Sequence, residues 1–193
     1  MNFCSYCGAE IIIRIPENDD RERYVCNSCD VVHYQNPKII TGCIPIWNDE
    51  VLLCRRAIEP RSGYWTLPAG FMELGETTVE AALRETREEA NARVEVLNLY
   101  VVINLPHVNQ VHMLFRSRLL DRGYSPGSES TDVDLFTEEQ IPWDDLAFGS
   151  IRHSLRFYFE DRKQGNFPLH VGDILKDGKD GNAFKFRPGP GQD

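Results

Sequence analysis

Four cysteines near the N-terminus restrict the fold of this chain more tightly than any other feature. Cys4 and Cys7 form one C-x2-C pair, Cys26 and Cys29 form a second, and eighteen residues separate the pairs. Two residues between thiolates allow a tight turn to present both sulfurs to one ion, and two such turns complete a tetrahedron around zinc. The pattern therefore predicts a small zinc ribbon over residues 1–38.

Other uses of these cysteines are less consistent with the sequence. Disulfides are rare in cytosolic proteins, and the segment MNFCSYCG lacks the charged and apolar regions of a signal peptide. A redox pair is disfavoured because no thioredoxin-like helix follows either pair. A catalytic zinc is disfavoured because four thiolates leave no open coordination position. We expect a structural zinc and a cytoplasmic protein, or a mature form whose targeting segment is missing.

The charge balance limits the partners of the chain. The formal net charge is −9, and residues 1–38 hold four Lys/Arg against six Asp/Glu. An acidic surface repels phosphate backbones, so we expect no nucleic-acid partner, and a phosphate-bearing substrate must meet local cations or bound metal. No apolar run is long enough to span a bilayer, so no membrane association is expected.

Hydrophobic patterns and turn residues divide the rest of the chain into a mixture of strands and helices. We predict strands at 39–47 and 51–57, a loop at 60–76, a helix at 78–90, strands at 94–105 and 111–120, a loop at 123–130 and a closing helix at 151–163 with Ser150 as its N-cap. This order is typical of an α+β domain. The predicted organisation is a ribbon at 1–38, a main domain at 39–172 and a tail at 173–193 with little regular structure.

The helix at 78–90 carries an unusual set of carboxylates. Thr77 and Glu80 make a capping box for its first turn. Glu85, Glu88 and Glu89 stand at i, i+3 and i+4, so they share one face and repel one another unless cations intervene. Hard oxygen ligands at this spacing suit Mg²⁺ or Mn²⁺.

Two further features bear on this helix. Arg84 lies one turn before Glu88 and is expected to pair with it. A narrow packing stripe is expected on another face, formed by Val79, Ala82, Leu83, Thr86 and Ala90. A Glu/Arg-rich helix face is most often merely solvated, so the carboxylates alone do not decide between a metal site and a surface. The sequence of the loop before the helix distinguishes these two possibilities.

The loop and helix together resemble the Nudix box, G-x5-E-x7-R-E-U-x-E-E-x-G-U, in which U is apolar. The six matching fixed positions are Gly70, Glu76, Arg84, Glu85, Glu88 and Glu89. Asn91 replaces the last glycine, but asparagine is the next-best residue for a left-handed helix end. Thr86 replaces an aliphatic residue and keeps β-branched bulk.

The resemblance extends over residues 1–165 to zinc-ribbon Nudix hydrolases of the bacterial and plant chloroplast type, which act on FAD and ADP-ribose. Matching segments are CSYCG, CNSCD, YQNPKII, GYWTLPAGFMELGET and IPWDDLAF. The family fold implied is an α/β/α sandwich around a mixed sheet, usually dimeric. The ribbon is expected to have a structural or dimer-supporting role.

The resemblance also implies a set of site residues. It places Mg²⁺ or Mn²⁺ on Glu85, Glu88, Glu89 and the carbonyl of Gly70, with Arg84 beside them. One of these glutamates, or a glutamate on a later loop, would act as the base. Glu129 is the later residue that we favour, and a solvated loop acid is the equal alternative.

Residues before the box are expected to contact substrate. Arg55 and Arg56 end a strand and face opposite ways, so one of them is expected to bind phosphate oxygens. A surface ion pair is the alternative. Trp65, and Tyr64 beside it, would stack on adenine or flavin, although core packing is the commoner fate of such residues.

Family subtypes narrow the substrate. NADH pyrophosphatases share the ribbon but carry an SQPWPFPxS segment after the box, and this sequence has none. Pro106 fits the proline that ADP-ribose enzymes often carry past the box. The sequence therefore predicts hydrolysis of ADP-ribose or FAD with release of AMP. The alternatives are an NADH or NAD-cap pyrophosphatase and a non-catalytic nucleotide sensor.

Overall fold

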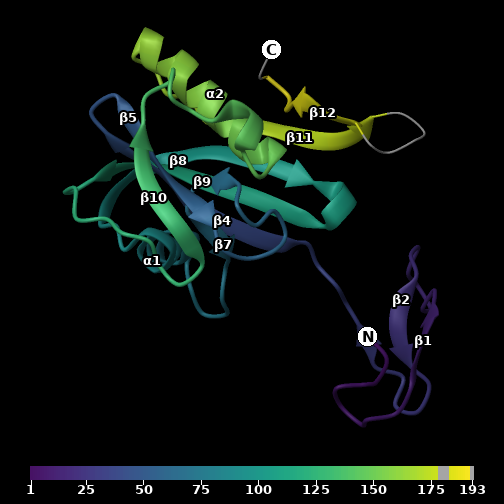
Figure 1. Ribbon diagram of the computed structural model, residues 1–193. Helices are drawn as coiled ribbons and strands as arrows, with labels where there is room; N and C mark the ends of the chain where they lie inside the picture. Colours follow the sequence, from purple (N-terminus) through teal and green to yellow (C-terminus); the bar gives the residue numbers. More distant parts are fainter. Residues whose placement is uncertain (178–182, 192–193) are drawn as a thin grey trace. The chain divides into compact units, whose positions relative to one another are not determined.

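The structure, a computed structural model, describes residues 1–177 and 183–191 (Figure 1). Contacts divide the chain into two compact units, Met1–Pro37 and Lys38–Asp193. In the first unit, β1 (Ile11–Arg14), β2 (Arg23–Cys26) and β3 (Val32–His33) form an antiparallel sheet in that order. Among the described residues, no helix is long and apolar enough to cross a bilayer.

Nine strands form one mixed sheet in the described part of the second unit. Seven follow one another in the order β10-β5-β4-β9-β8-β11-β12, while β6 pairs with β5 and β7 pairs with β4. The strands are β4 (Lys38–Trp47), β5 (Glu50–Arg56), β6 (Trp65–Thr66), β7 (Ala69–Phe71), β8 (Val94–Leu105), β9 (Gln110–Leu119), β10 (Ser130–Phe136), β11 (His170–Asp177) and β12 (Ala183–Pro188). The β4–β9 and β8–β11 pairs are parallel and the others antiparallel.

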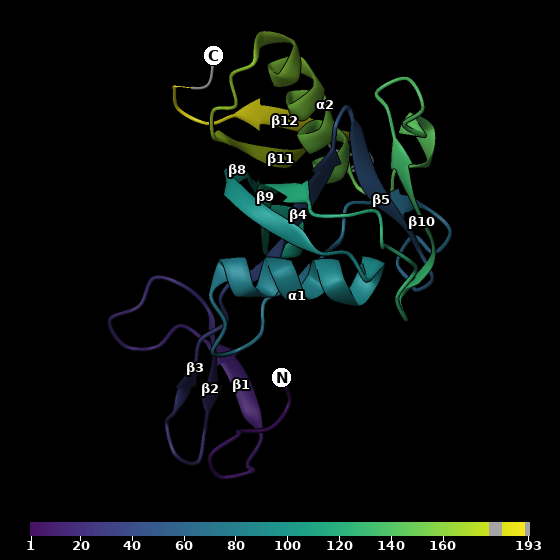
Figure 2. The ribbon, with the colours of Figure 1, turned by 90° about the vertical axis from the view of Figure 1, so that its left-hand side faces the viewer.

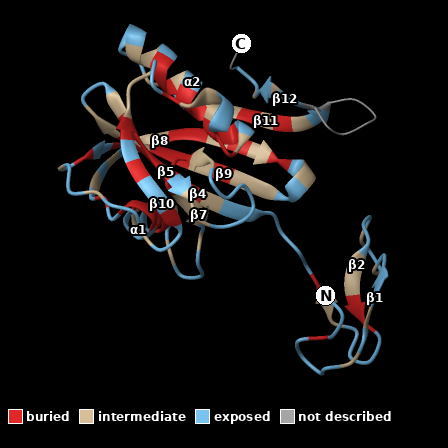
Figure 3. Ribbon diagram, viewed as in Figure 1, coloured by how far each residue is buried: buried red, intermediate tan, exposed pale blue. Residues whose placement is uncertain are grey.

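Two helices cover opposite faces of this sheet. Figure 2 shows α1 (Thr78–Ala90) on one side and α2 (Gly149–Gln164) on the other. Two short 3-10 helices, Pro106–Val108 and Trp143–Asp145, lie in the connections. Buried residues concentrate in the central strands and on the inner sides of the helices (Figure 3). The α+β fold and its α/β/α layering are confirmed.

The first turn of α1 follows from its sequence. Thr77 is the N-cap, its hydroxyl accepts from the backbone N–H of Glu80, and the Glu80 carboxylate accepts from the backbone N–H of Thr77. At the other end Asn91 adopts φ 48° and ψ 22°, the left-handed conformation predicted for it. The predicted bounds 78–90 and both caps are confirmed.

The buried face of α1 differs from the predicted stripe. Val79 is 37% exposed, whereas Ala81 is fully buried. Glu85 and Glu89 are buried together with Ala82, Thr86 and Ala90. Because the residues that face the sheet include two carboxylates, apolar spacing alone misplaced the face of the helix that the protein buries.

Three predictions about the main unit need correction. Ser150 does not cap α2, because the helix begins at Gly149 and Phe148 occupies the N-cap position. The predicted loop at 60–76 contains β6 and β7, and β10 was not predicted.

The prediction of little regular structure after residue 172 is also wrong. Residues 170–173 of β11 pair with residues 101–104 of β8, and β12 pairs with β11. Ile174 and Phe186 pack against the main core. These strands form because the sheet offers them an edge and an apolar surface, which local sequence does not show. Residues 178–182 and 192–193 of the predicted tail lie outside the described residues.

Candidate active site and zinc centre

The four cysteines of the first unit form a compact sulfur cluster. The Sγ atoms of Cys4 and Cys29 lie 3.7 Å apart and those of Cys7 and Cys26 lie 3.4 Å apart. All four ligand atoms lie within 4.8 Å of one another, and the thiols are free rather than disulfide-bonded. A tetrahedral Zn²⁺ with Zn–S bonds of about 2.3 Å separates its sulfurs by about 3.8 Å. The cluster therefore fits one zinc ion.

Backbone amides reinforce this cluster. The N–H groups of Tyr6 and Ser28 each point at a cysteine sulfur, Sγ of Cys4 and Sγ of Cys26, at 3.4 Å. Each donor lies two residues after its cysteine, because the turn inside a C-x2-C pair aims the following N–H groups at the first thiolate. Such donors stabilise negative charge on sulfur, which a zinc ligand carries.

In the second unit, β7 brings its backbone against a carboxylate of α1. Gly70 pairs with Thr41 of β4. A Cβ added at Gly70 would lie 2.4 Å from Oε2 of Glu85, so a side chain at this position would collide with the carboxylate. Only glycine allows this approach without displacing Glu85.

Glu89 is the most deeply buried carboxylate of α1. It is 6% exposed, and the backbone N–H of Ala69 donates to its Oε2 at 3.2 Å. The pKa of Glu89 is raised to about 8, chiefly by burial. The carboxylates of Glu85 and Glu129 contribute to this rise, while the Ala69 N–H and Arg56 oppose it. The pKa of Glu85 is also raised, chiefly by burial. The ionised forms of these two carboxylates are therefore disfavoured unless more positive charge is brought to them.

Arg84 holds several of the acidic side chains in place. Its guanidinium donates to Glu76 at 2.6 Å, to Glu85 at 2.7 Å and to Glu88 at 2.9 Å, and also to the carbonyl of Phe71 at 3.0 Å. The predicted ion pair with Glu88 is present. One arginine thus ties the loop before α1 to the helix and fixes the Glu85 carboxylate beside Gly70.

The three predicted metal-ligating glutamates are not equally placed. The Glu88 side chain is 57% exposed, and Arg84 stands between it and Glu85. Within residues 1–177 and 183–191, the cysteine cluster is the only group of three or more His, Cys, Asp or Glu ligand atoms that lie within 4.8 Å of one another. The carboxylates are therefore clustered less tightly than the thiols.

The loop 123–130 is fastened to the C-terminal end of α1. The N–H groups of Ser125 and Gly127 donate to the carbonyls of Ala90 and Glu89 at 2.9 and 3.0 Å. The Asn91 side-chain amide lies within 3.1–3.2 Å of three acceptors on Ser125 and Pro126. These contacts hold the loop close to the acidic end of the helix.

Two further contacts fix the position of Glu129 at the end of this loop. Gly127 approaches the helix so closely that an added Cβ would lie 1.6 Å from the Glu88 carbonyl oxygen. The Glu129 carbonyl accepts from the N–H of Ala57 at 2.8 Å. Glu129 is exposed, yet it lies near enough to Glu85 and Glu89 to raise the pKa of both.

Two family models match the chain. The NUDIX domain model matches residues 37–150, and the Nudix N-terminal zinc-ribbon model matches residues 2–35. The chain belongs to the Nudix family. It combines a zinc-ribbon domain at its N-terminus with a Nudix domain.

Individual Nudix relatives agree with this assignment. A crystal structure of a NUDIX hydrolase from Nitrosomonas europaea is 57% identical, with a TM-score of 0.88 over 90% of this chain and 99% of that one. The NAD-capped RNA hydrolase NudC of Photorhabdus laumondii is 35% identical over 148 residues, 72% of this chain and 53% of that protein. The chain thus spans about half the length of the curated relatives it matches.

A third neighbour supports the fold only. The structure of an ADP-ribose pyrophosphatase from Streptococcus suis is 22% identical, with a TM-score of 0.59 over 70% of this chain and 99% of that one. The predicted likeness to Nudix enzymes is confirmed, but the curated relatives carry the name of NAD-capped RNA hydrolases. The narrower likeness to FAD and ADP-ribose enzymes stays a prediction.

The remaining predicted residues lie on β5 and β6. Arg55 is exposed and its Nε donates to the Gly63 carbonyl at 2.9 Å. Arg56 lies over the Phe148 ring at 5.3 Å and is close enough to Glu89 to affect its pKa. The two arginines differ in surroundings, as the alternation of a strand requires.

Trp65 makes the contacts of a packed core residue. It is partly buried against the main core and meets Phe136 edge-on, with ring centroids 4.9 Å apart. Its indole therefore already has an apolar neighbour. Stacking on a substrate base stays a prediction for whatever part of the ring is left exposed.

Sequence reasoning missed two contributors. The Glu76 carboxylate makes the shortest hydrogen bond to Arg84, although the box pattern named it only as a fixed position. The pKa of Glu76 is lowered to about 2, mainly by that bond. Asn91 was valued only for its backbone, and its amide contacts needed tertiary structure. The Ser125-Pro126-Gly127 turn was the available signal for a close approach.

Proposed function

We propose that this chain hydrolyses the diphosphate bridge of a nucleoside diphosphate derivative, ADP-ribose or FAD, and releases AMP. The observation that supports this proposal is the set of buried, poorly compensated carboxylates, Glu85 and Glu89, packed beside the Gly70 backbone. Buried charge of one sign is unfavourable unless an opposite charge binds it. A divalent cation would supply that charge.

The donor set fits Mg²⁺ or Mn²⁺. Glu85, Glu89 and the Gly70 carbonyl offer hard oxygen ligands from two rigid elements, and the exposed Glu88 would join through its own oxygens or through water. When bound, such ions supply neutralisation of charge on the diphosphate oxygens and activation of the attacking water. The ion in the ribbon would be Zn²⁺ with a structural role, since four thiolates leave no open position.

The chain's own residues would prepare the reaction. Arg84 orients Glu85 through the hydrogen bond between them. Glu129, on its fastened loop, would accept a proton from water near the carboxylates. Arg56 would contact a phosphate oxygen, because it already lies near enough to Glu89 to oppose the rise in the pKa of that group. Trp65 would contact the base or flavin. We also expect a homodimer.

A second candidate activity is hydrolysis of NAD or of NAD-capped RNA. The curated relatives with the name NAD-capped RNA hydrolase favour it. The missing SQPWPFPxS segment argues against it. If this activity were found, the expectation of no nucleic-acid substrate would have to be withdrawn.

A substrate panel tests the proposal. The purified chain is incubated with Mg²⁺ or Mn²⁺ and with ADP-ribose, FAD, NADH, coenzyme A or an NAD-capped oligoribonucleotide, and AMP release is followed by chromatography. ADP-ribose or FAD is expected to have the highest kcat/KM. Preference for NADH or the capped RNA would support the second candidate, and no turnover of any compound would refute both.

Asn91 is expected to act as a positioning residue for Glu129. Asn91→Gly keeps the left-handed helix end but removes the amide contacts to the loop, so kcat is expected to fall about tenfold with little change in KM. Asn91→Asp, which tolerates the same backbone but cannot donate, should behave alike.

Asn109→Gly is the matched control for Asn91. Asn109 also has positive φ, 53°, and the described residues include no side-chain hydrogen bond for it. The kcat of the Asn109→Gly variant is expected to equal that of the original chain. If Asn91→Gly and Asn109→Gly have the same kcat, the contacts of the Asn91 side-chain amide with the loop have no part in catalysis.

A further inference from the structure

A pocket of about 340 Å³ opens on the α2 side of the sheet, away from α1. Its lining includes residues from the C-terminal half of α2 and from the turn between β4 and β5. Gly70 pairs with Thr41, five residues along β4 from Ile46 in the pocket wall, which corresponds to about 16 Å of strand. The pocket is therefore separate from the carboxylate site.

Three arginines line this pocket of an acidic protein: Arg116, Arg118 and Arg162. Arg118 is paired with Glu95. Neither Arg116 nor Arg162 has a carboxylate partner within salt-bridge distance among residues 1–177 and 183–191. Two guanidinium groups are thus available for an anion.

Both available arginines are held in fixed orientations. Nε of Arg116 donates to Oδ1 of Asn98 at 3.0 Å, and its guanidinium stacks 3.9 Å from the Phe167 ring centroid. Nη1 of Arg162 donates to the Asp49 carbonyl at 2.7 Å. The other N–H groups of the two guanidiniums can still donate to a ligand. A ligand would therefore meet guanidiniums that are already oriented rather than flexible side chains.

Tyr158 adds an unpartnered hydroxyl. It lines the pocket and is only 2% exposed, and no hydrogen bond to its hydroxyl occurs within the described part of the chain. Burial raises the pKa of Tyr158, while Arg162 and Arg116 oppose this shift and Asp49 adds to it, so both guanidiniums lie near the phenol. The Tyr158 hydroxyl is not among the buried polar atoms that lack a partner, so it is accessible from the pocket and available to donate to a ligand there.

We infer that this pocket binds a phosphomonoester, with its phosphate on Arg116, Arg162 and the Tyr158 hydroxyl. Bidentate guanidinium contacts and a neutral O–H donor match phosphate oxygens. Ile46, Leu97 and Phe167 provide apolar walls for the organic group, and the volume is that of a small-molecule site. A nucleoside monophosphate satisfies both requirements. This inference does not depend on the proposed catalytic activity.

The test is binding of AMP, ribose 5-phosphate and inorganic phosphate to the full chain without added Mg²⁺ or Mn²⁺. Binding is followed through the arginine Nε–H resonances in ¹H–¹⁵N spectra. AMP is expected to shift those of Arg116 and Arg162. Inorganic phosphate should shift the same signals more weakly, and ribose 5-phosphate reveals whether the base contributes. If none of the three shifts either resonance at millimolar concentration, the inference is wrong.

Three variants sharpen this test. Arg116→Met and Tyr158→Phe remove charge and hydroxyl with little loss of volume, and each is expected to weaken AMP binding at this pocket, by about tenfold or more for Arg116→Met. Arg93→Met removes an exposed arginine that pairs with Asp121 elsewhere and should bind as the original chain does. Equal affinity in all three variants would overturn the inference, and thermal midpoints establish that each variant is folded.

Discussion

Replacing Glu89 with glutamine is expected to lower kcat for AMP release by about 10²–10³-fold. Glutamine has nearly the same shape and can still accept from the Ala69 N–H, so the position of the side chain should persist. What is lost is the negative charge that would bind a divalent cation. Steady-state kinetics with saturating Mg²⁺ or Mn²⁺ measures the effect.

The stability of the Glu89→Gln variant without added metal is not expected to fall as its kcat does. Because burial raises the pKa of Glu89 to about 8, the ionised form is disfavoured in the metal-free fold at neutral pH. The neutral amide avoids that penalty, so the thermal midpoint of Glu89→Gln without added divalent ions is expected to equal or exceed that of the original chain. Addition of Mg²⁺ should raise the midpoint of the original chain more than that of the variant.

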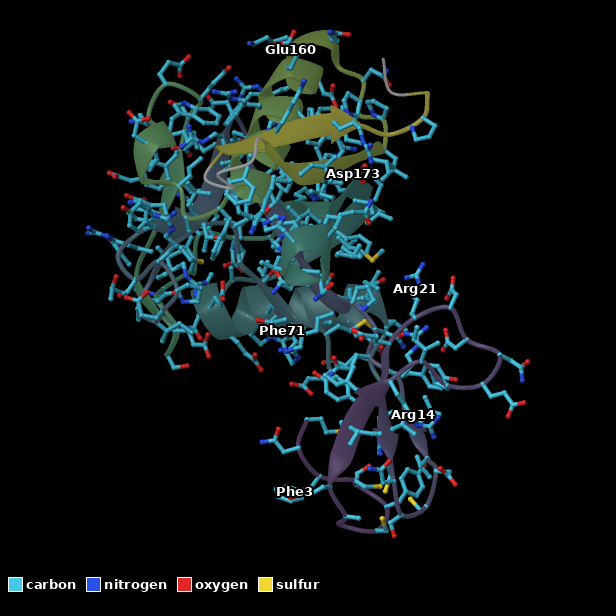
Figure 4. All side chains as sticks on the ribbon, turned by 90° about the vertical axis from the view of Figure 1, so that its right-hand side faces the viewer. Phe3, Arg14, Arg21, Phe71, Glu160 and Asp173 are labelled. Atoms are coloured by element: carbon cyan, nitrogen blue, oxygen red, sulfur yellow. The ribbon has the colours of Figure 1, made fainter. Side chains whose placement is uncertain are left out.

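Glu160→Gln is the matched control for Glu89→Gln. Glu160 projects from α2, the helix on the side of the sheet away from Phe71 and α1 (Figure 4), and pairs only loosely with Lys163 at 3.4 Å. The kcat of the Glu160→Gln variant and the shift of its thermal midpoint with Mg²⁺ should match those of the original chain. Full activity of Glu89→Gln would show that the Glu89 carboxylate has no part in the reaction. A loss of kcat in both variants would indicate a general effect of charge.

Removal of zinc is expected to unfold residues 1–37 and leave the main unit folded. The ribbon buries few side chains, among them Cys4, Val25, Cys26 and His33, and such a small core cannot stabilise a domain without a metal. Elemental analysis should find about one zinc per chain. After chelation, hydrogen exchange should accelerate throughout residues 1–37 and remain slow in β4, β8 and β9.

A serine substitution separates zinc binding from thiol chemistry in general. Cys26→Ser removes a fully buried ligand and should lower zinc content and protection of the ribbon together. Cys43→Ser removes another fully buried thiol, which donates to the Ala82 carbonyl on the main unit, and should keep the zinc. A ribbon that remains protected without zinc, or that contains disulfides, would contradict the zinc centre.

Much of the site could be predicted because its signals are local. The capping box at Thr77 and Glu80, the left-handed Asn91 and the i, i+3 and i+4 spacing of the glutamates are all properties of one short segment. The same holds for the C-x2-C turns. Interactions within a few residues depend on backbone geometry that the sequence specifies directly.

Other parts of the site depend on segments far apart in the chain. Glu129 approaches Glu89 because Ser125, Gly127 and Asn91 join a distant loop to the helix end. The burial of Glu85 and the exposure of Glu88 follow from where the Gly70 backbone passes, which the spacing of the three glutamates cannot show. The strands β11 and β12 form because β8 provides an edge for them.

The amino-acid sequence by itself determined the cysteine pattern, the carboxylate pattern and the ends of α1, and it indicated the Nudix family. Those features are set by turn geometry, helix periodicity and ligand chemistry within short segments. Only the tertiary structure decided which carboxylates are buried, which loop joins them and where the arginine pocket lies. Burial and charge compensation arise between residues that are distant in sequence, so they exist only once the sheet has brought them together.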